Sequence, residues 1–125
     1  SFNTPPVFPI YCILLNLRLI KQEGIDSISK KNKIKSELIY SEIDRNKCFS
    51  GFSEVSDRSQ MNATFNMKEG FDSELFNKIC SNNKISGING HRSVGGYRAS
   101  IYNALSLDSL NVLVDSMKEF ELSQE

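Results

Sequence analysis

The stretch from Gly90 to Ala104, GHRSVGGYRASIYNA, holds the side chains of this sequence that are best suited to chemistry. It contains His91, Arg92 and Arg98, with a glycine pair between the two arginines. Each arginine has a planar fork of donors that can bind a phosphate or a carboxylate through two parallel hydrogen bonds, which lysine cannot do. These residue types predict the binding of a small anion.

The spacing of the two arginines requires a turn between them. They are six positions apart, and extended chain at about 3.3 Å per residue would separate them by roughly 20 Å. Gly95 and Gly96 permit a turn, because a residue without a Cβ reaches positive φ at little cost and lets a ligand approach the backbone. An alternative hypothesis stays open, in which the glycines form an ordinary loop, the arginines are solvated and His91 donates to a backbone carbonyl.

Several motifs, in order along the chain, resemble one enzyme family. NTPPVFPIY, KKNKIKSELIYSEID, DRSQMN and DSMKEFE are similar to segments of phosphoserine aminotransferases, and GHRSVGGYRASIYNA resembles their C-terminal signature. These are pyridoxal-phosphate enzymes with the aspartate-aminotransferase-like fold type. The similarity covers nearly the whole chain but only roughly the last third of such an enzyme. Since the chain also begins in mid-motif without methionine, we interpret it as a C-terminal fragment.

The resemblance implies roles for individual residues. His91 and Arg92 match the pair that binds the phosphate of phosphoserine, and Arg98 matches the arginine that binds the substrate α-carboxylate. Asn3 and Thr4 match residues that reach across a homodimer to the phosphate of pyridoxal 5'-phosphate in the other subunit. The parent enzyme would transfer an amino group from glutamate to 3-phosphohydroxypyruvate, giving 2-oxoglutarate and phosphoserine for serine biosynthesis. In some bacteria such an enzyme also serves pyridoxine synthesis.

The same resemblance implies what this chain lacks. Transamination with pyridoxal phosphate needs a lysine for the Schiff base and an acid that keeps the pyridinium nitrogen protonated, and in the family both lie upstream of the matched part. We therefore expect no catalytic residue here, and neither firm cofactor binding nor activity from this chain alone. The alternative is a stand-alone, non-enzymatic α+β module that binds a small anionic ligand or a protein partner.

Length, charge and cysteine spacing limit the class of protein. A chain of 125 residues with 39% hydrophobic content suffices for one globular core. Lys plus Arg number 15, as do Asp plus Glu, so no net field would attract nucleic acid or an anionic membrane. Cys12, Cys48 and Cys80 have no CxxC spacing, which argues against a zinc site and favours a reducing, cytoplasmic compartment. The apolar run over 10–15 is too short to span a membrane.

Apolar periodicity predicts the elements that would position these side chains. Helices are expected over about 9–23, 25–44, 71–81 and 107–122, and strands over 49–54, 58–65, 84–88 and 99–102. This order predicts a two-layer α+β fold, with a small, mainly antiparallel sheet covered by helices on one face. The resemblance implies that residues 1–24 form an interdomain segment with an apolar linking helix. Residues 25–125 would form the small domain of a fold-type-I aminotransferase.

Individual positions in these elements carry further expectations. The first helix is apolar on most sides and needs partners on more than one face, and Gly24 should cap its end. Four inward positions are expected in the second helix, at Ile28, Leu38, Ile39 and Ile43. A further inward position should be filled either by Ile34 or by the stem of Lys35. Its polar face should carry Lys30, Lys31, Lys33 and Lys35, and we interpret this face as solvated rather than as a patch that binds nucleic acid.

Ser106 should cap the last helix, whose inward residues would be Leu110, Leu113, Val114, Met117 and Phe120. Arg58 and Asn62 are expected to have structural roles.

Overall fold

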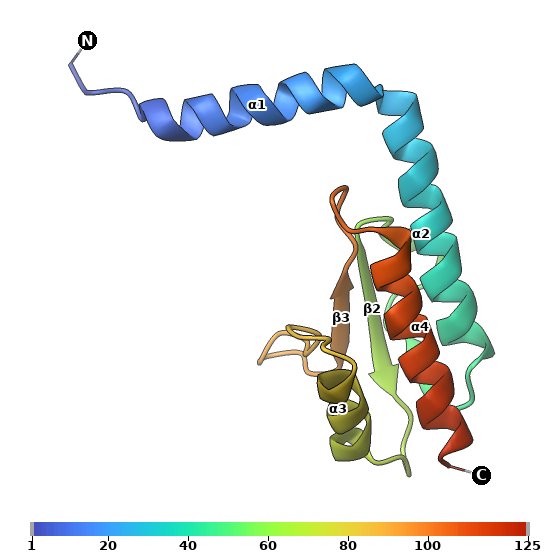
Figure 1. Cartoon of the computed structure of the whole chain (residues 1–125). Coiled ribbons are helices and arrows are strands. Elements are labelled where there is room, and N and C mark those ends of the chain that lie inside the picture. Colours follow the sequence, from blue (N-terminus) through green and yellow to red (C-terminus); the bar gives the residue numbers. More distant parts are fainter. Residues whose placement is uncertain (1, 125) are drawn as a thin grey trace. The chain divides into compact units, whose positions relative to one another are not determined.

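The computed structural model describes residues 2–124 of the chain, shown in Figure 1. Within this part, the helices are α1 (Val7–Glu23), α2 (Ile25–Arg45), α3 (Ser73–Asn82) and α4 (Leu107–Leu122), with a 3-10 turn at Val55–Asp57. The strands are β1 (Phe49–Gly51), β2 (Asn62–Met67) and β3 (Tyr97–Ser100). The chain divides into two compact units, Ser1–Lys31 and Asn32–Glu125.

The first unit is built around α1. This helix begins at Val7, two residues before the expected start, because Pro9 then falls in the first turn, where a missing N–H costs nothing. Gly24 ends the helix as predicted, with φ of 86° and its N–H donating to the carbonyl of Ile20 at 2.9 Å. No residue of α1 is buried, so its many apolar side chains have no core of their own within this unit.

The second unit contains an antiparallel sheet with strand order β1-β2-β3. The register pairs Gly51 with Phe65, and Thr64 with Arg98. Side chains alternate across β2 and β3, so that one face is buried under the helices while Arg98 lies on the other. The predicted two-layer α+β fold, with helices on one face of a small antiparallel sheet, is therefore confirmed.

The strand expected over 84–88 is wrong. That segment leads only to an isolated bridge between Asn89 and Tyr97. Lys84 has φ of 60° and Gly87 has φ of 70°, and such left-handed positions interrupt an extended strand. The other strands exist but are displaced by two to four residues at one or both ends from the expected ranges.

Aromatic rings from the sheet and the helices form the centre of the core. The ring centroid of Phe49 lies 5.6 Å from that of Phe65, 4.9 Å from that of Phe76 and 5.7 Å from that of Phe120. These separations suit tilted and edge-to-face aromatic packing. The inward residues predicted for α4 are all buried, and Ser106 caps this helix by accepting from the backbone N–H of Ser109 at 3.1 Å.

The sequence left Lys35 of α2 either inward through its stem or on the solvated face; the inward position is confirmed and the solvated one is wrong. Lys35 is only 4% exposed, whereas the neighbouring Ile34 is 53% exposed. The Lys35 ammonium donates to the backbone carbonyls of Ile101, Tyr102 and Leu105 at 3.1, 2.6 and 3.3 Å. These bonds replace water around the cation, although burial still lowers the pKa of Lys35. The loop that follows β3 is thus attached to α2 by a buried cation.

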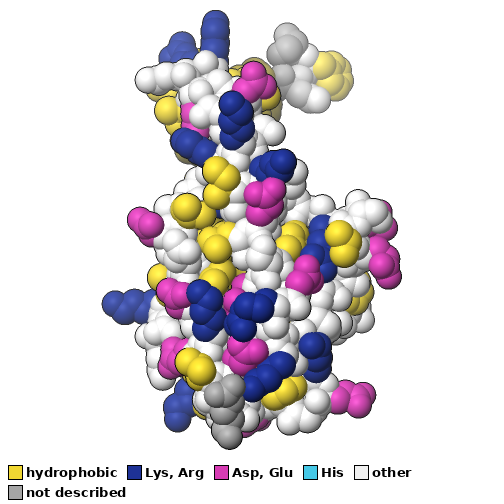
Figure 2. Space-filling model, turned by 90° about the vertical axis from the view of Figure 1, so that its right-hand side faces the viewer, with side chains coloured by type: hydrophobic (Ala, Val, Ile, Leu, Met, Phe, Trp, Pro, Cys, Tyr) yellow, Lys and Arg dark blue, Asp and Glu magenta, His cyan; other side chains and the backbone are white. Residues whose placement is uncertain are grey.

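The charges on the surface are mixed in sign. The face drawn in Figure 2 intersperses Lys and Arg side chains with Asp and Glu side chains and carries no large patch of one sign. In the part of the chain that the structure describes, no helix has the length and apolar character needed to cross a membrane.

Candidate functional site

The loop from Gly90 to Gly96 has the tight turn that the glycine pair predicted. Gly95 and Gly96 have φ of 77° and 64°. The carbonyl of His91 accepts hydrogen bonds from the backbone N–H groups of Val94 and Gly95, at 2.9 and 2.8 Å. The N–H of Gly90 donates to the carbonyl of Gly96 at 2.8 Å, which closes the base of the loop. The loop therefore folds back over the start of β3.

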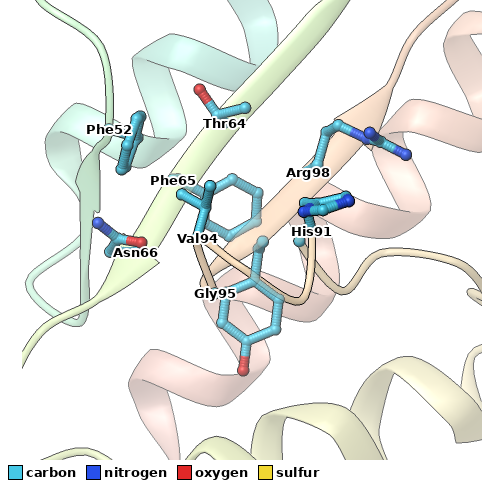
Figure 3. Close-up of a pocket in the computed structure, with 10 residues that line it drawn as sticks. Phe52, Thr64, Phe65, Asn66, His91, Val94, Gly95 and Arg98 are labelled. Atoms are coloured by element: carbon cyan, nitrogen blue, oxygen red, sulfur yellow. The ribbon is translucent and has the colours of Figure 1, made fainter.

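A cavity of about 240 Å³ lies between this loop and the sheet face that the helices leave uncovered. Figure 3 shows His91 and Arg98 on one side of it, with Phe52 and Asn66 on the opposite side. Among the described residues that line it, none is a lysine, an aspartate or a glutamate. The charged or chargeable side chains of the lining are a histidine and an arginine, which favour an anion, while Phe52, Phe65, Val94 and Tyr97 make much of the rest apolar.

The structure brings two of the predicted site residues together. His91 and Arg98 share the cavity lining, although they are seven positions apart in the sequence. Arg92 is exposed and is not part of this lining, and it makes no hydrogen bond or ion pair with any described residue. Asn3 and Thr4 lie ahead of α1 in the first unit, where both are exposed.

Three further lining residues were not predicted from the sequence. Thr64 faces the cavity because it pairs with Arg98 in the sheet register, and Asn66 follows on the same face of β2. The alternation of polar and apolar residues along this strand was the signal that could have indicated both. Phe52, which is 55% exposed just after β1, had no such signal, since its position depends on where the strand ends.

Arg58 and Asn62 are held by contacts within the fold. Two nitrogens of Arg58 donate to the two carboxylate oxygens of Asp44 at 2.6 and 2.7 Å, and its guanidinium carbon lies 4.6 Å from the ring centroid of Tyr40. The hydrogen bond from Arg58 lowers the pKa of Asp44. Asn62 accepts a hydrogen bond from the hydroxyl of Ser100 at 3.3 Å. These contacts agree with the expected structural roles.

The described part of the chain contains no candidate metal centre, and two of its three cysteines are buried. No group of three or more His, Cys, Asp or Glu residues there could hold a metal ion. Cys48 and Cys80 are buried and free, and Cys12 is free as well. Burial raises the pKa of Cys80 to about 11, which keeps this thiol protonated and unreactive.

Comparisons with known proteins give a consistent result. The family model for aminotransferase class-V matches residues 1–113. The chain is 56% identical over 121 residues to a phosphoserine aminotransferase of Flavobacterium psychrophilum, and 50% identical over 121 residues to that of Flavobacterium johnsoniae. Each alignment covers 96% of this chain and 34% of the relative. The chain thus spans about a third of the length of these relatives.

Solved structures with the same fold carry the same name. A phosphoserine aminotransferase from Bacillus circulans subsp. alkalophilus superimposes with a TM-score of 0.92 at 38% identity, over 99% of this chain and 35% of that one. The pyridoxal-phosphate-bound enzyme from Trichomonas vaginalis gives a TM-score of 0.85 at 34% identity, over 94% of this chain and 34% of that one.

Proposed function

The chain belongs to the aminotransferase class-V family, and from this premise we propose that it is the C-terminal part of a phosphoserine aminotransferase. The parent enzyme transfers an amino group between glutamate and 3-phosphohydroxypyruvate, and so makes O-phosphoserine for serine biosynthesis. The observation that carries the proposal is the shared cavity of His91 and Arg98 on the uncovered sheet face. A site for an anionic amino acid needs cationic or donor groups of this kind.

The proposed substrate contacts follow from the chemistry of each side chain. Arg98 projects from a strand of the sheet, so its backbone is fixed by a rigid element, and its fork suits the α-carboxylate that all the amino-acid substrates share. His91 and Arg92 are proposed to bind the distal phosphate of phosphoserine. Arg92 is free of partners among the described residues, so its guanidinium is available to a ligand.

Pyridoxal phosphate does not fit this cavity by itself. The described lining offers neither a lysine for a Schiff base nor an acid for the pyridinium nitrogen. Lys35, the buried lysine, already donates to three backbone carbonyls. We therefore propose that the reacting part of the cofactor is held by other parts of the parent enzyme. Asn3 and Thr4 carry amide and hydroxyl donors that suit the cofactor phosphate of the second subunit in a homodimer.

The proposed partners are small molecules: phosphoserine, glutamate, 2-oxoglutarate and 3-phosphohydroxypyruvate. Nucleic acid and membranes are not proposed, which is supported by the equal numbers of acidic and basic residues and by the mixed charges of the face in Figure 2. A cytoplasmic location is proposed because the three cysteines are free, as expected in a reducing compartment.

The test is to extend the reading frame upstream and to assay the longer protein beside this chain. The longer protein is expected to convert glutamate and 3-phosphohydroxypyruvate to 2-oxoglutarate and phosphoserine, and to bind pyridoxal phosphate through one lysine that borohydride labels. This chain alone is expected to do neither. A stoichiometrically labelled lysine in this chain, or a longer protein without the activity, would overturn the proposal and favour an anion-binding module.

A further inference from the structure

The imidazole of His91 is held from one side by Ser93. The hydroxyl oxygen of Ser93 lies 2.7 Å from Nδ1 of His91, and the backbone N–H of Ser93 donates to the same nitrogen at 3.3 Å. Nδ1 therefore faces a backbone N–H, which can donate a hydrogen bond but cannot accept one. The second ring nitrogen, Nε2, has no partner among the described residues.

These two contacts select one form of the ring. A neutral imidazole carries its proton on one nitrogen and accepts through the other. If the proton were on Nδ1, it would oppose the backbone N–H of Ser93. With the proton on Nε2, Nδ1 accepts from both the N–H and the hydroxyl of Ser93.

We propose that Ser93 is a positioning residue that holds His91 as the Nε2–H tautomer, so that the imidazole presents a hydrogen-bond donor to the ligand that shares the cavity with Arg98. The guanidinium of Arg98 also offers only donors. This side of the cavity is therefore complementary to the acceptor oxygens of a carboxylate or a phosphate, and it disfavours a ligand that presents an amino or hydroxyl proton there.

The inference deepens the proposed function and rests on it only for the identity of the anion. The tautomer itself depends on contacts within one short loop, and it needs neither substrate nor cofactor. A purely structural role for Ser93 would affect the stability of the loop without setting the position of the ring proton.

Nuclear magnetic resonance of the full chain can test this directly, because His91 is its single histidine. Long-range proton–nitrogen spectra of ¹⁵N-labelled chain, at mildly alkaline pH where histidine side chains are neutral, report which ring nitrogen carries the proton. The Ser93→Ala variant loses the hydroxyl donor, whereas Ser93→Thr retains it. The Ser86→Ala variant removes an exposed serine from another loop and serves as the matched control.

The wild-type chain is expected to show Nε2 protonated and Nδ1 unprotonated. Ser93→Ala should shift the tautomer ratio towards Nδ1–H by about 2- to 12-fold, the effect of one neutral hydrogen bond, while Ser93→Thr and Ser86→Ala should match the wild type. A wild-type ring with Nδ1 protonated, or an unchanged ratio in Ser93→Ala, would overturn the inference. If the tautomer is as expected but the longer protein lacks aminotransferase activity, the inference stands and the proposed function falls.

Discussion

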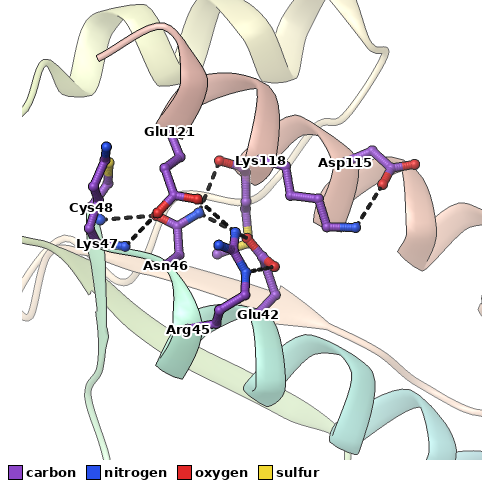
Figure 4. A network of polar contacts seen from close by, with 9 residues as sticks. Glu42, Arg45, Asn46, Lys47, Cys48, Asp115, Lys118 and Glu121 are labelled. Carbon is purple, nitrogen blue, oxygen red and sulfur yellow. Dashed lines mark hydrogen bonds and ion pairs between the residues drawn. The ribbon is translucent and has the colours of Figure 1, made fainter. Parts of the chain in front are cut away.

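Arg45 and Glu121, near the ends of α2 and α4, form an ion pair in which Nη2 of Arg45 lies 2.7 Å from Oε2 of Glu121 (Figure 4). The other carboxylate oxygen of Glu121 accepts the backbone N–H of Lys47 at 2.8 Å. Beside them, the buried amide of Asn46 donates to Glu42 at 2.9 Å and to the carbonyl of Met117 at 3.1 Å. The network attaches the C-terminal helix to the start of β1.

This network should make the stability of the chain sensitive to acid. The hydrogen bond from the Lys47 N–H, with a further one from Arg45, lowers the pKa of Glu121 below its ordinary value of 4.5. A carboxyl with a lowered folded-state pKa contributes stability that is present above that ordinary value and is lost as the pH falls through the folded-state pKa. We expect the melting temperature to fall steeply below about pH 4.5, as measured by circular dichroism.

The matched variant for this test is Glu121→Gln, which keeps an acceptor for Lys47 but cannot titrate. It should be less stable than the wild type at pH 7, and the difference should shrink as the pH falls. Asp44 also has a lowered pKa, through its hydrogen bond from Arg58, so part of the acid sensitivity should remain. A constant difference between the two proteins at every pH would show that Glu121 does not contribute through its charge.

Gly96 should tolerate no side chain, unlike Gly70. Both have positive φ, 64° and 91°. A Cβ on Gly96 would collide with Oδ1 of Asn66 and lie 2.9 Å from the carbonyl oxygen of Phe65, whereas one on Gly70 would meet nothing within 4 Å. Gly70→Ala should therefore cost about 1–2 kcal/mol from its backbone conformation, and Gly96→Ala should cost more. Urea unfolding of the two variants measures the difference, and equal costs would contradict the collision.

Features that depend on local sequence could be predicted, whereas those set by distant contacts could not. Ser106 and the inward face of α4 follow from a capping residue and a 3.6-residue period, and both were predicted. The burial of Lys35 depends on carbonyls that lie 66 to 70 positions later in the chain, so its helical position alone could not decide between an inward and a solvated side chain. A lysine on a helix is usually solvated.

In the candidate site, too, some features could be predicted from the sequence and others could not. The glycine pair indicated the turn that lets His91 and Arg98 share a cavity. The absence of Arg92 from that lining, and the hydrogen bonds between Ser93 and His91, depend on the conformation of one loop. A pattern of residue types does not specify the direction in which consecutive side chains point when the backbone turns.

The apolar surface of α1 should cause the chain to associate. Ile10, Ile13 and Leu17 lie on one stripe and are 53%, 57% and 57% exposed, and large exposed apolar patches rarely persist on monomers. Replacing all three by lysine should shift light-scattering masses towards the monomer across a concentration series. The control is Asn16→Lys, an exposed polar position on the same helix. A wild-type chain that is monomeric with an ordered α1 would contradict this prediction.

Arg92 and Arg98 should divide the recognition of substrate in the parent enzyme. If Arg98 holds the α-carboxylate that phosphoserine and glutamate share, Arg98→Ala should slow both half-reactions. If Arg92 holds the distal group, Arg92→Ala should affect phosphoserine more than glutamate, because a phosphate dianion carries more charge than a carboxylate. A charge-assisted hydrogen bond contributes about 1.5 to 3 kcal/mol, so each loss should reduce kcat/KM by roughly ten-fold to more than a hundred-fold.

Single-turnover kinetics of each half-reaction separates the two roles. Lys68→Ala, which removes an exposed cation outside the cavity lining, controls for the general loss of positive charge. Equal losses on phosphoserine and glutamate for Arg92→Ala would show that Arg92 does not discriminate the phosphate. A loss confined to phosphoserine for Arg98→Ala would show that the two arginines have exchanged roles, with the cavity residue on the phosphate and the exposed residue on the carboxylate.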